Sequence, residues 1–104
     1  MGQPQPTPIN RRRHPRWAVP RDGRHLLEFW WPSRKGHRCS MRLNDLSTAG
    51  LSFVLEHDLP GLEICHPIRT ADVRLGDVKF KADLVVIHIT SAPGRPTVCG
   101  ALVY

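Results

Sequence analysis

The chain has 104 residues, and 15 Lys and Arg against 9 Asp and Glu give it a net charge of +6 with neutral histidines. This length suits one small domain and excludes a Rossmann pair or a TIM barrel. No apolar run approaches the ~18 residues that a membrane-spanning helix needs, and the N-terminus lacks the pattern of a signal peptide. The three cysteines are far apart and odd in number, which argues against a disulfide framework. We therefore expect a cytoplasmic domain, either alone or as a piece of a longer protein.

The positive charge is concentrated in the first half of the chain. Residues 11–42 hold ten Lys and Arg against two acidic residues, whereas residues 43–104 hold five against seven. A basic segment attached to a nearly neutral body indicates an anionic partner. Composition does not choose between nucleic acid, a nucleotide, an anionic lipid and an acidic protein.

The chain begins with a segment of different composition from the rest. Residues 1–10 contain three prolines spaced by polar residues and no charged side chain. Such a segment cannot build a packed core, so we predict a disordered, Pro-rich leader over residues 1–10. Residues 11–104 are then the domain, with the basic segment at residues 11–16 as its first part.

From residue 23 onward the apolar residues recur with a period of two, which is typical of strands. No segment shows a helical stripe with caps, and about six strands joined by short turns predict an all-β antiparallel barrel. Closing the sheet also removes exposed edges. The expected inward-facing sets are Leu27, Phe29 and Trp31; Cys39, Met41 and Leu43; Leu51, Phe53 and Leu55; Ala71, Val73 and Leu75; and Val78, Phe80, Ala82 and Leu84. A phase change over residues 84–87 predicts a bulge or a strand that is covered on both sides, and a loop over residues 91–96 precedes the last strand.

Two arginines stand four residues apart in the basic segment, just before the first of these strands. Arg12 and Arg16 enclose Pro15, which stiffens the backbone. A guanidinium offers a planar fork of donors that can bind two phosphate oxygens or the O6/N7 edge of guanine, and it stacks on bases. The alternative interpretation of such a cluster is a solvated basic tail.

A second motif, Asp45-x-Ser47-x-x-Gly50, lies between two predicted strands. Asp and Ser in such a connection commonly bond the local backbone, and Gly50 would supply a positive φ angle, so the motif by itself indicates a turn. The spacing nevertheless puts Asp45 and Ser47 on one face. An exposed carboxylate there could accept hydrogen bonds from guanine N1–H and N2–H₂, with a hydroxyl beside it.

Taken together, Arg-x-x-x-Arg before a β domain and Asp-x-Ser-x-x-Gly about 30 residues later resemble the PilZ family of cyclic di-GMP receptors. The resemblance implies a six-stranded barrel with the arginine segment over its surface strands. It also implies that Arg12 and Arg16 clamp the phosphates and a guanine edge of cyclic di-GMP, and that Asp45 and Ser47 contact the other side of that guanine. Gly50 would shape the connection between the strands.

The resemblance carries further expectations. Family members with an arginine at the position of Arg11 often hold a stacked pair of ligands, so we expect Arg11 to bind cyclic di-GMP as well. The family's usual C-terminal helix is not visible, because the sequence stops at Tyr104 after a strand pattern. The implied role is a receptor module, not an enzyme, with no cofactor, no specific nucleic acid and an unknown downstream protein partner.

Two other functions stay open at the level of sequence. One is a small basic barrel that binds single-stranded nucleic acid, which would need several exposed aromatic side chains. The other is a PilZ-like protein-interaction domain without a ligand, although the intact arginine, aspartate and serine positions argue against it.

The remaining polar and aromatic residues favour structural roles. Histidines and cysteines lack metal-ligand spacing, so we expect no metal site, and the cysteines are expected to behave as small buried hydrophobes. His88 is interpreted as a hydrogen-bonded barrel histidine. Trp17 could stack on a guanine or seal the barrel, and we favour the seal. Trp30 and Trp31 are adjacent and must face opposite sides of their strand.

Overall fold

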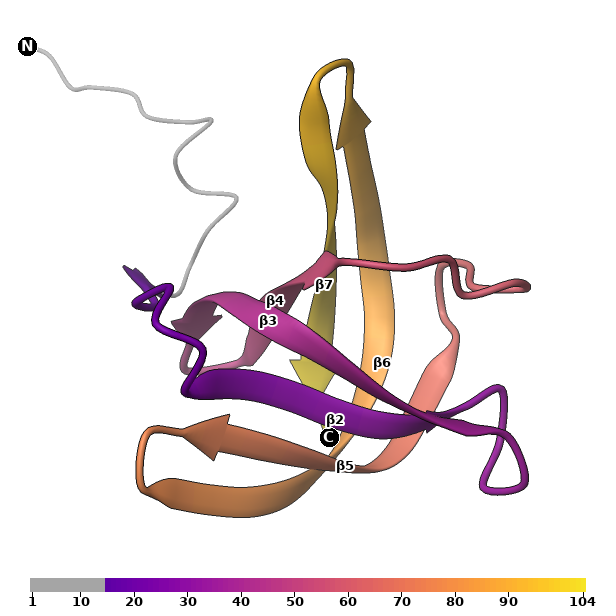
Figure 1. The fold of residues 1–104 in the computed structure, drawn as a ribbon, viewed down its shortest axis with the longest axis horizontal. Helices are drawn as coiled ribbons and strands as arrows, with labels where there is room; N and C mark the ends of the chain where they lie inside the picture. Colours follow the sequence, from indigo (N-terminus) through magenta and orange to yellow (C-terminus); the bar gives the residue numbers. More distant parts are fainter. Residues whose placement is uncertain (1–14) are drawn as a thin grey trace, which may run out of the picture.

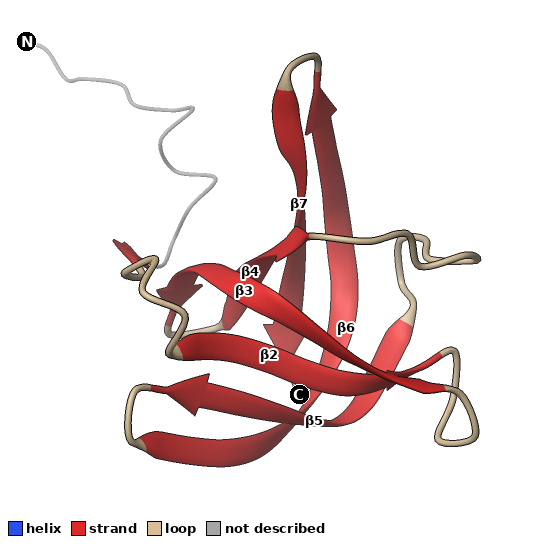
Figure 2. Ribbon diagram, viewed as in Figure 1, coloured by secondary structure: helices blue, strands red, loops and turns tan. Residues whose placement is uncertain are grey.

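The computed structural model describes residues 15–104, which form strands and connecting turns and no helix (Figures 1 and 2). The predicted leader over residues 1–10, as well as Arg11 and Arg12, lies outside the described residues. Within residues 15–104 there is no helix long and apolar enough to cross a membrane. The strands are β1 (Arg16–Ala18), β2 (His25–Trp31), β3 (His37–Ser47), β4 (Gly50–Leu55), β5 (Pro67–Leu75), β6 (Val78–Ala92) and β7 (Arg95–Val103).

Six of these strands close into an antiparallel barrel. The hydrogen-bonded order is β3-β2-β5-β6-β7-β4, and β4 pairs back onto β3. The closing pair is registered by Leu46 opposite Leu51 and Asp45 opposite Ser52. β1 lies outside this ring and pairs with the last residues of β3. The predicted six-stranded barrel is confirmed, and β1 is a short additional strand in a region expected to be a surface segment.

The core follows from the period-two pattern, because alternate side chains of a strand point to opposite faces of the sheet. Two phenylalanines at the centre, Phe29 and Phe53, are fully buried, with their ring centroids 6.0 Å apart. Most of the side chains expected to face inward are buried with them: Leu27, Trp31, Cys39, Met41, Leu43, Leu51, Ala71, Val73 and Leu84.

One expectation at each end of β6 is wrong. Val78 and Phe80 were expected to face the core, yet they are 59% and 44% exposed. The register of β6 with β7 begins at Leu84, so residues 78–82 pair with β5 alone and extend past the covered part of the barrel. At the other end β6 continues to Ala92 where a loop was expected, and with β7 it forms a hairpin that stands away from the barrel in Figure 1.

The predicted bulge in β6 is confirmed by a register shift between Val86 and His88. Val86 is buried in the core, and after the shift it is Ile89, opposite buried Cys99, that packs against the core. His88 is thereby left on the outer surface of the barrel. The bulge therefore determines that His88, and not Ile89, is on the outer surface of β6.

An ionic cluster lies on the outer surface formed by β2, β3, β5 and β6. Asp72 is 5% exposed, and its carboxylate accepts hydrogen bonds from Arg38 and, at 2.8 Å, from Lys81 Nζ. These contacts, the bond from Lys81 first, lower the pKa of Asp72 against the opposing effect of burial. The Arg38 guanidinium also lies 5.5 Å from the centre of the Trp30 ring. Trp30 is exposed and Trp31 buried, as predicted for adjacent residues of one strand.

Candidate ligand-binding site

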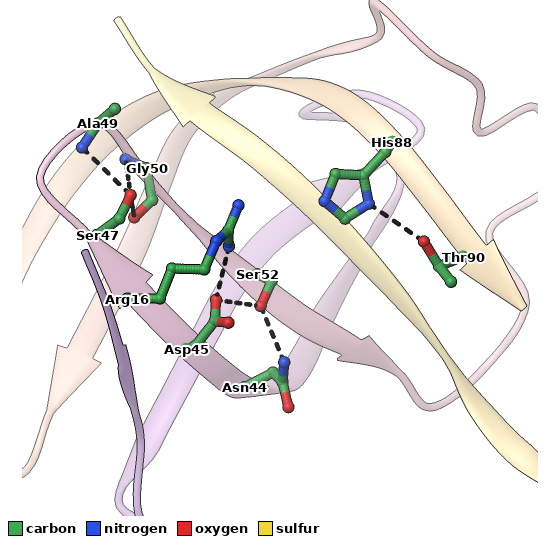
Figure 3. Close-up of polar contacts among 9 residues, drawn as sticks. All are labelled: Arg16, Asn44, Asp45, Ser47, Ala49, Gly50, Ser52, His88 and Thr90. Carbon is green, nitrogen blue, oxygen red and sulfur yellow. Dashed lines mark hydrogen bonds and ion pairs between the residues drawn. The ribbon is translucent and has the colours of Figure 1, made fainter. Parts of the chain in front are cut away.

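The backbone of β1 brings the arginine segment to the end of β3. Arg16 lies opposite Ser47 and Ala18 opposite Asp45, and the Val19 amide donates to the Asn44 carbonyl at 3.1 Å. This pairing places the Arg16 side chain over the outer surface of the barrel, beside Asp45 (Figure 3). Arg16 Nη1 donates to Asp45 Oδ1 at 3.1 Å. The Arg16 and Asp45 side chains are 28% and 21% exposed, so a solute can still reach the pair.

A bulge in β3 is the reason that Asp45 faces outward. Leu43 points into the core, and in a regular strand Asp45, two residues later, would point the same way. The register shifts between Leu43 and Asp45, after which Leu46 packs against the core. The bulge thus turns the Asp45 carboxylate to the surface, while Leu46 keeps its contact with the core.

The carboxylate of Asp45 is held in place by its neighbours on β3 and β4. Ser52 Oγ donates to Asp45 Oδ1 at 2.6 Å, and Asn44 Nδ2 donates to Ser52 Oγ at 3.1 Å (Figure 3). Ser52 is only 2% exposed, so its hydroxyl serves to fix the aspartate. Among residues 15–104, no side chain or amide donates to the other oxygen, Asp45 Oδ2. One acceptor of the carboxylate is therefore left for a ligand by these residues.

Ser47 has a local role in the turn between β3 and β4. Its hydroxyl accepts hydrogen bonds from the amides of Ala49 at 3.3 Å and Gly50 at 3.1 Å, and it is 3.4 Å from the Gly50 carbonyl oxygen (Figure 3). The structure thus places Ser47 near the Arg16–Asp45 pair, with its hydroxyl engaged by the turn. The expectation that this motif forms a turn is confirmed for Ser47.

Gly50 is needed for a reason different from the one expected. It was expected to supply a positive φ angle, but the glycines with positive φ in residues 15–104 are Gly23, Gly61, Gly76 and Gly94. Gly50 instead begins β4, where a Cβ atom would lie 2.1 Å from the carbonyl oxygen of Ala101 on β7. The absence of a side chain lets β4 and β7 approach at this corner.

Trp17 does not seal the barrel, which corrects the interpretation favoured from the sequence. It is 53% exposed and lies opposite Leu46. Neighbouring residues of a strand point to opposite sides, so Trp17 projects away from the side on which Arg16 meets Asp45. Because β1 lies outside the closed ring of six strands, the side of the sheet on which Trp17 stands is not enclosed there, and the indole is left in solvent.

Sequence reasoning missed the partners that neighbouring strands contribute. Asp45 lies opposite Ser52, Ser52 opposite Gly100 and Gly100 opposite His88, so these four residues form a row across β3, β4, β7 and β6. The alternation around Leu51 and Phe53 already puts Ser52 on the outer surface. The register that lines up the row depends on two bulges, and period-two patterning does not specify it.

Within the described residues, potential metal ligands and thiols do not gather into a second site. Residues 15–104 contain no group of three His, Cys, Asp or Glu side chains arranged to hold a metal ion. Cys39 and Cys99 are buried, as predicted, and burial raises the pKa of both thiols. Protonated, buried thiols are poor nucleophiles. Cys65 is exposed, contrary to the expectation for all three cysteines.

Solved structures share this barrel. The PilZ domain of YcgR from Escherichia coli, solved with c-di-GMP, superposes with a TM-score of 0.74 at 21% identity, over 89% of this chain and 77% of that one. The complex of MrkH from K. pneumoniae with c-di-GMP gives 0.70 at 17% identity, over 88% and 43%. The longer YcgR structure with c-di-GMP gives 0.73 at 20% identity, over 90% and 38%.

These likenesses show that the chain has the PilZ-domain fold. It spans less than half of MrkH and of the longer YcgR chain. Neither a protein-family model nor the sequence of a curated protein matches it.

Proposed function

We propose that this domain is a cyclic di-GMP receptor module whose ligand sits over the Arg16–Asp45 pair on the outer surface of the barrel. The observation that carries the proposal is this pair, fixed by Ser52, at one corner of a barrel with the PilZ fold. Solved relatives of that fold were determined with c-di-GMP, which supports the choice of ligand. The proposed activity is binding and regulation, with no catalysed reaction and no cofactor.

The chemistry of the ligand matches the groups at this corner. Cyclic di-GMP carries two phosphate charges and two guanines. A guanine presents N1–H and N2–H₂ as neighbouring donors, and Asp45 Oδ2 is an acceptor that residues 15–104 leave open to them. Arg16 uses Nη1 on Asp45, and its other N–H groups are donors for a phosphate or for guanine O6 and N7.

Arg12 and Arg11 complete the proposed site from the preceding segment. Four residues of extended chain span at most about 14 Å, so the Arg12 backbone stays within that distance of Arg16. Arg12 is proposed to bind the phosphates with Arg16, and Arg11 to hold a second, stacked ligand. Ser47 and Gly50 are proposed to maintain the turn that borders the site.

Binding is proposed to order the arginine segment against the barrel and so to change a contact with a downstream protein. A ligand shifts such an equilibrium only by its preference for the ordered state. Binding through Arg11 and Arg12 provides that preference, because their proposed contacts exist only when the segment lies on the barrel, whereas Arg16 is already paired with Asp45.

The test is calorimetric titration of the full chain with cyclic di-GMP, GTP and a short single-stranded oligonucleotide. We expect saturable binding of cyclic di-GMP, with two ligands per chain if they stack, and weaker binding of GTP. Arg11→Ala should lower the stoichiometry to one. Tighter binding of the oligonucleotide would instead indicate a nucleic-acid-binding barrel. If the chain binds neither cyclic di-GMP nor the oligonucleotide, a protein-interaction domain would be indicated. Either result would overturn the proposal.

A further inference from the structure

On the basis of the proposed function, we propose that His88 is a further ligand contact, at the other end of the bound ligand from the Arg16–Asp45 pair. The imidazole is proposed to donate a hydrogen bond from Nε2 to an acceptor of the bound cyclic dinucleotide, either a phosphate oxygen or guanine N7 or O6. His88 lies 43 residues beyond Asp45 in the sequence, outside both motifs that predicted the site.

His88 ends a row of residues that crosses four strands of the barrel. Asp45, Ser52, Gly100 and His88 are register partners in turn, on β3, β4, β7 and β6. Adjacent strands are about 4.8 Å apart, so the path along the curved sheet from Asp45 to His88 crosses three strand spacings, roughly 14 Å. The His88 ring covers part of this path because it lies over Gly100, and the proposed ligand, with one guanine on Asp45, reaches toward the ring from β3.

Neither of the two middle residues of the row has a side chain that projects from the surface. Ser52 is buried and bonded to Asp45, and Gly100 has no side chain. A side chain at position 100 would stand where the His88 ring now lies, since its Cβ would be 2.1 Å from His88 Nε2. Gly100 thus lets the imidazole lie across β7, toward the Arg16–Asp45 pair.

The orientation of the ring leaves one nitrogen for the ligand. His88 Nδ1 is 3.4 Å from Thr90 Oγ1 on the side away from Arg16, and Nε2 is on the side of the ring toward Arg16 and Ser52 (Figure 3). When the Thr90 hydroxyl donates to Nδ1, a neutral imidazole carries its proton on Nε2. The Nε2–H group then points toward Arg16 and Ser52, where the ligand is proposed to lie. The phosphates and the N7/O6 edges of the guanines present only acceptors to it.

The first test compares variants of the full chain by titration with cyclic di-GMP. His88→Ala should weaken binding about tenfold, as expected for the loss of one hydrogen bond to an anionic or polar ligand. His88→Gln, which keeps an N–H donor, should retain part of the affinity. His57→Ala is the matched control, because His57 is exposed between β4 and β5, and it should bind as the wild type does.

The second test asks whether Gly100 acts through His88. Gly100→Ala should displace the imidazole and lower the affinity as much as His88→Ala, and the double variant should bind no more weakly than His88→Ala alone. If Gly100→Ala fails to fold, judged by its thermal unfolding, the two His88 variants still decide the matter.

The outcomes separate this inference from the proposed function. Tight binding by the wild type and by His88→Ala alike would overturn the role of His88 and leave the receptor function intact. Failure of the wild type to bind cyclic di-GMP would overturn both.

Discussion

Arg16 Nη1 lies 3.1 Å from Asp45 Oδ1, joining a strand at the start of the domain to the end of β3, 29 residues later. This ion pair joins the two parts of the proposed site. A partly exposed ion pair of this kind contributes only about 0–1 kcal/mol to stability. Exchanging part of it for contacts to a dinucleotide therefore costs little.

Arg16→Ala and Asp45→Ala should each weaken cyclic di-GMP binding by about ten- to a hundredfold. Each removes a contact to guanine or phosphate of the kind that contributes roughly 1–3 kcal/mol in base recognition. Arg24→Ala is the control, because Arg24 forms an exposed pair with Asp77 elsewhere on the barrel. Titration calorimetry measures the effect, and equal affinities for the three variants would contradict the assignment.

Ser47→Ala should destabilise the domain by about 1–2 kcal/mol. Its hydroxyl is the acceptor for the amides of Ala49 and Gly50, and an unsatisfied amide costs on the order of 1 kcal/mol. Urea unfolding gives the free energy, with Ser40→Ala, at an exposed position of the same strand, as the control. A free energy of unfolding unchanged from wild type would show that water replaces the hydroxyl at no cost.

Gly50→Ala should be the more damaging change, with a loss of roughly 3 kcal/mol or failure to fold. The new methyl would meet the backbone carbonyl of Ala101, and a backbone atom cannot move aside as a flexible side chain can. Gly23→Asn is the control, since Gly23 has positive φ, open space around it and a replacement that tolerates that conformation. Thermal unfolding should separate the two variants clearly, and similar melting temperatures would contradict the close approach.

Asp72→Asn should change how the free energy of unfolding depends on pH in the acid range. The folded-state pKa of Asp72 is lowered from its ordinary value of 3.8, first by Lys81 and also by Arg38. The stability that this carboxylate contributes is therefore present above pH 3.8 and is lost as the pH falls through its lower folded-state pKa. The wild type should exceed Asp72→Asn in stability near neutral pH, and the difference should shrink below about pH 4.

The control for that series is Asp58→Asn, at an exposed position between β4 and β5. Its stability should follow the wild type across the pH range, by urea unfolding at fixed ionic strength. A constant gap between Asp72→Asn and wild type from pH 7 to pH 2 would show that the Asp72 ion pairs are not responsible.

Much of the fold could be predicted because alternation reports which residues share a face of a strand. The buried positions of β2 and β3 follow directly from that pattern. Alternation does not report how far the neighbouring strands extend, which is why Phe80 was expected in the core. It stands opposite buried Val73, on the correct side of its strand, where β7 no longer pairs with β6.

The candidate site could be predicted only in part. Local motifs identified Arg16 and Asp45, because their chemistry and spacing are visible along the chain. Ser52 and His88 depend on registers set by the bulges in β3 and β6, which align residues from four strands. Trp17 was expected to seal the barrel because it is apolar. It is exposed instead, because a three-residue edge strand has no core beside it.

The most direct test of whether cyclic di-GMP lies over the Arg16–Asp45 pair is to record the amide and indole NMR signals of the full chain during titration with this ligand. We expect the largest chemical-shift changes at Arg16, Asp45, Ser52 and Gly100. Signals of Trp30, Asp72 and Lys81, on the surface that carries the ionic cluster, should stay in place. Shifts concentrated around Trp30 and Asp72, with Asp45 and Gly100 unmoved, would contradict the account.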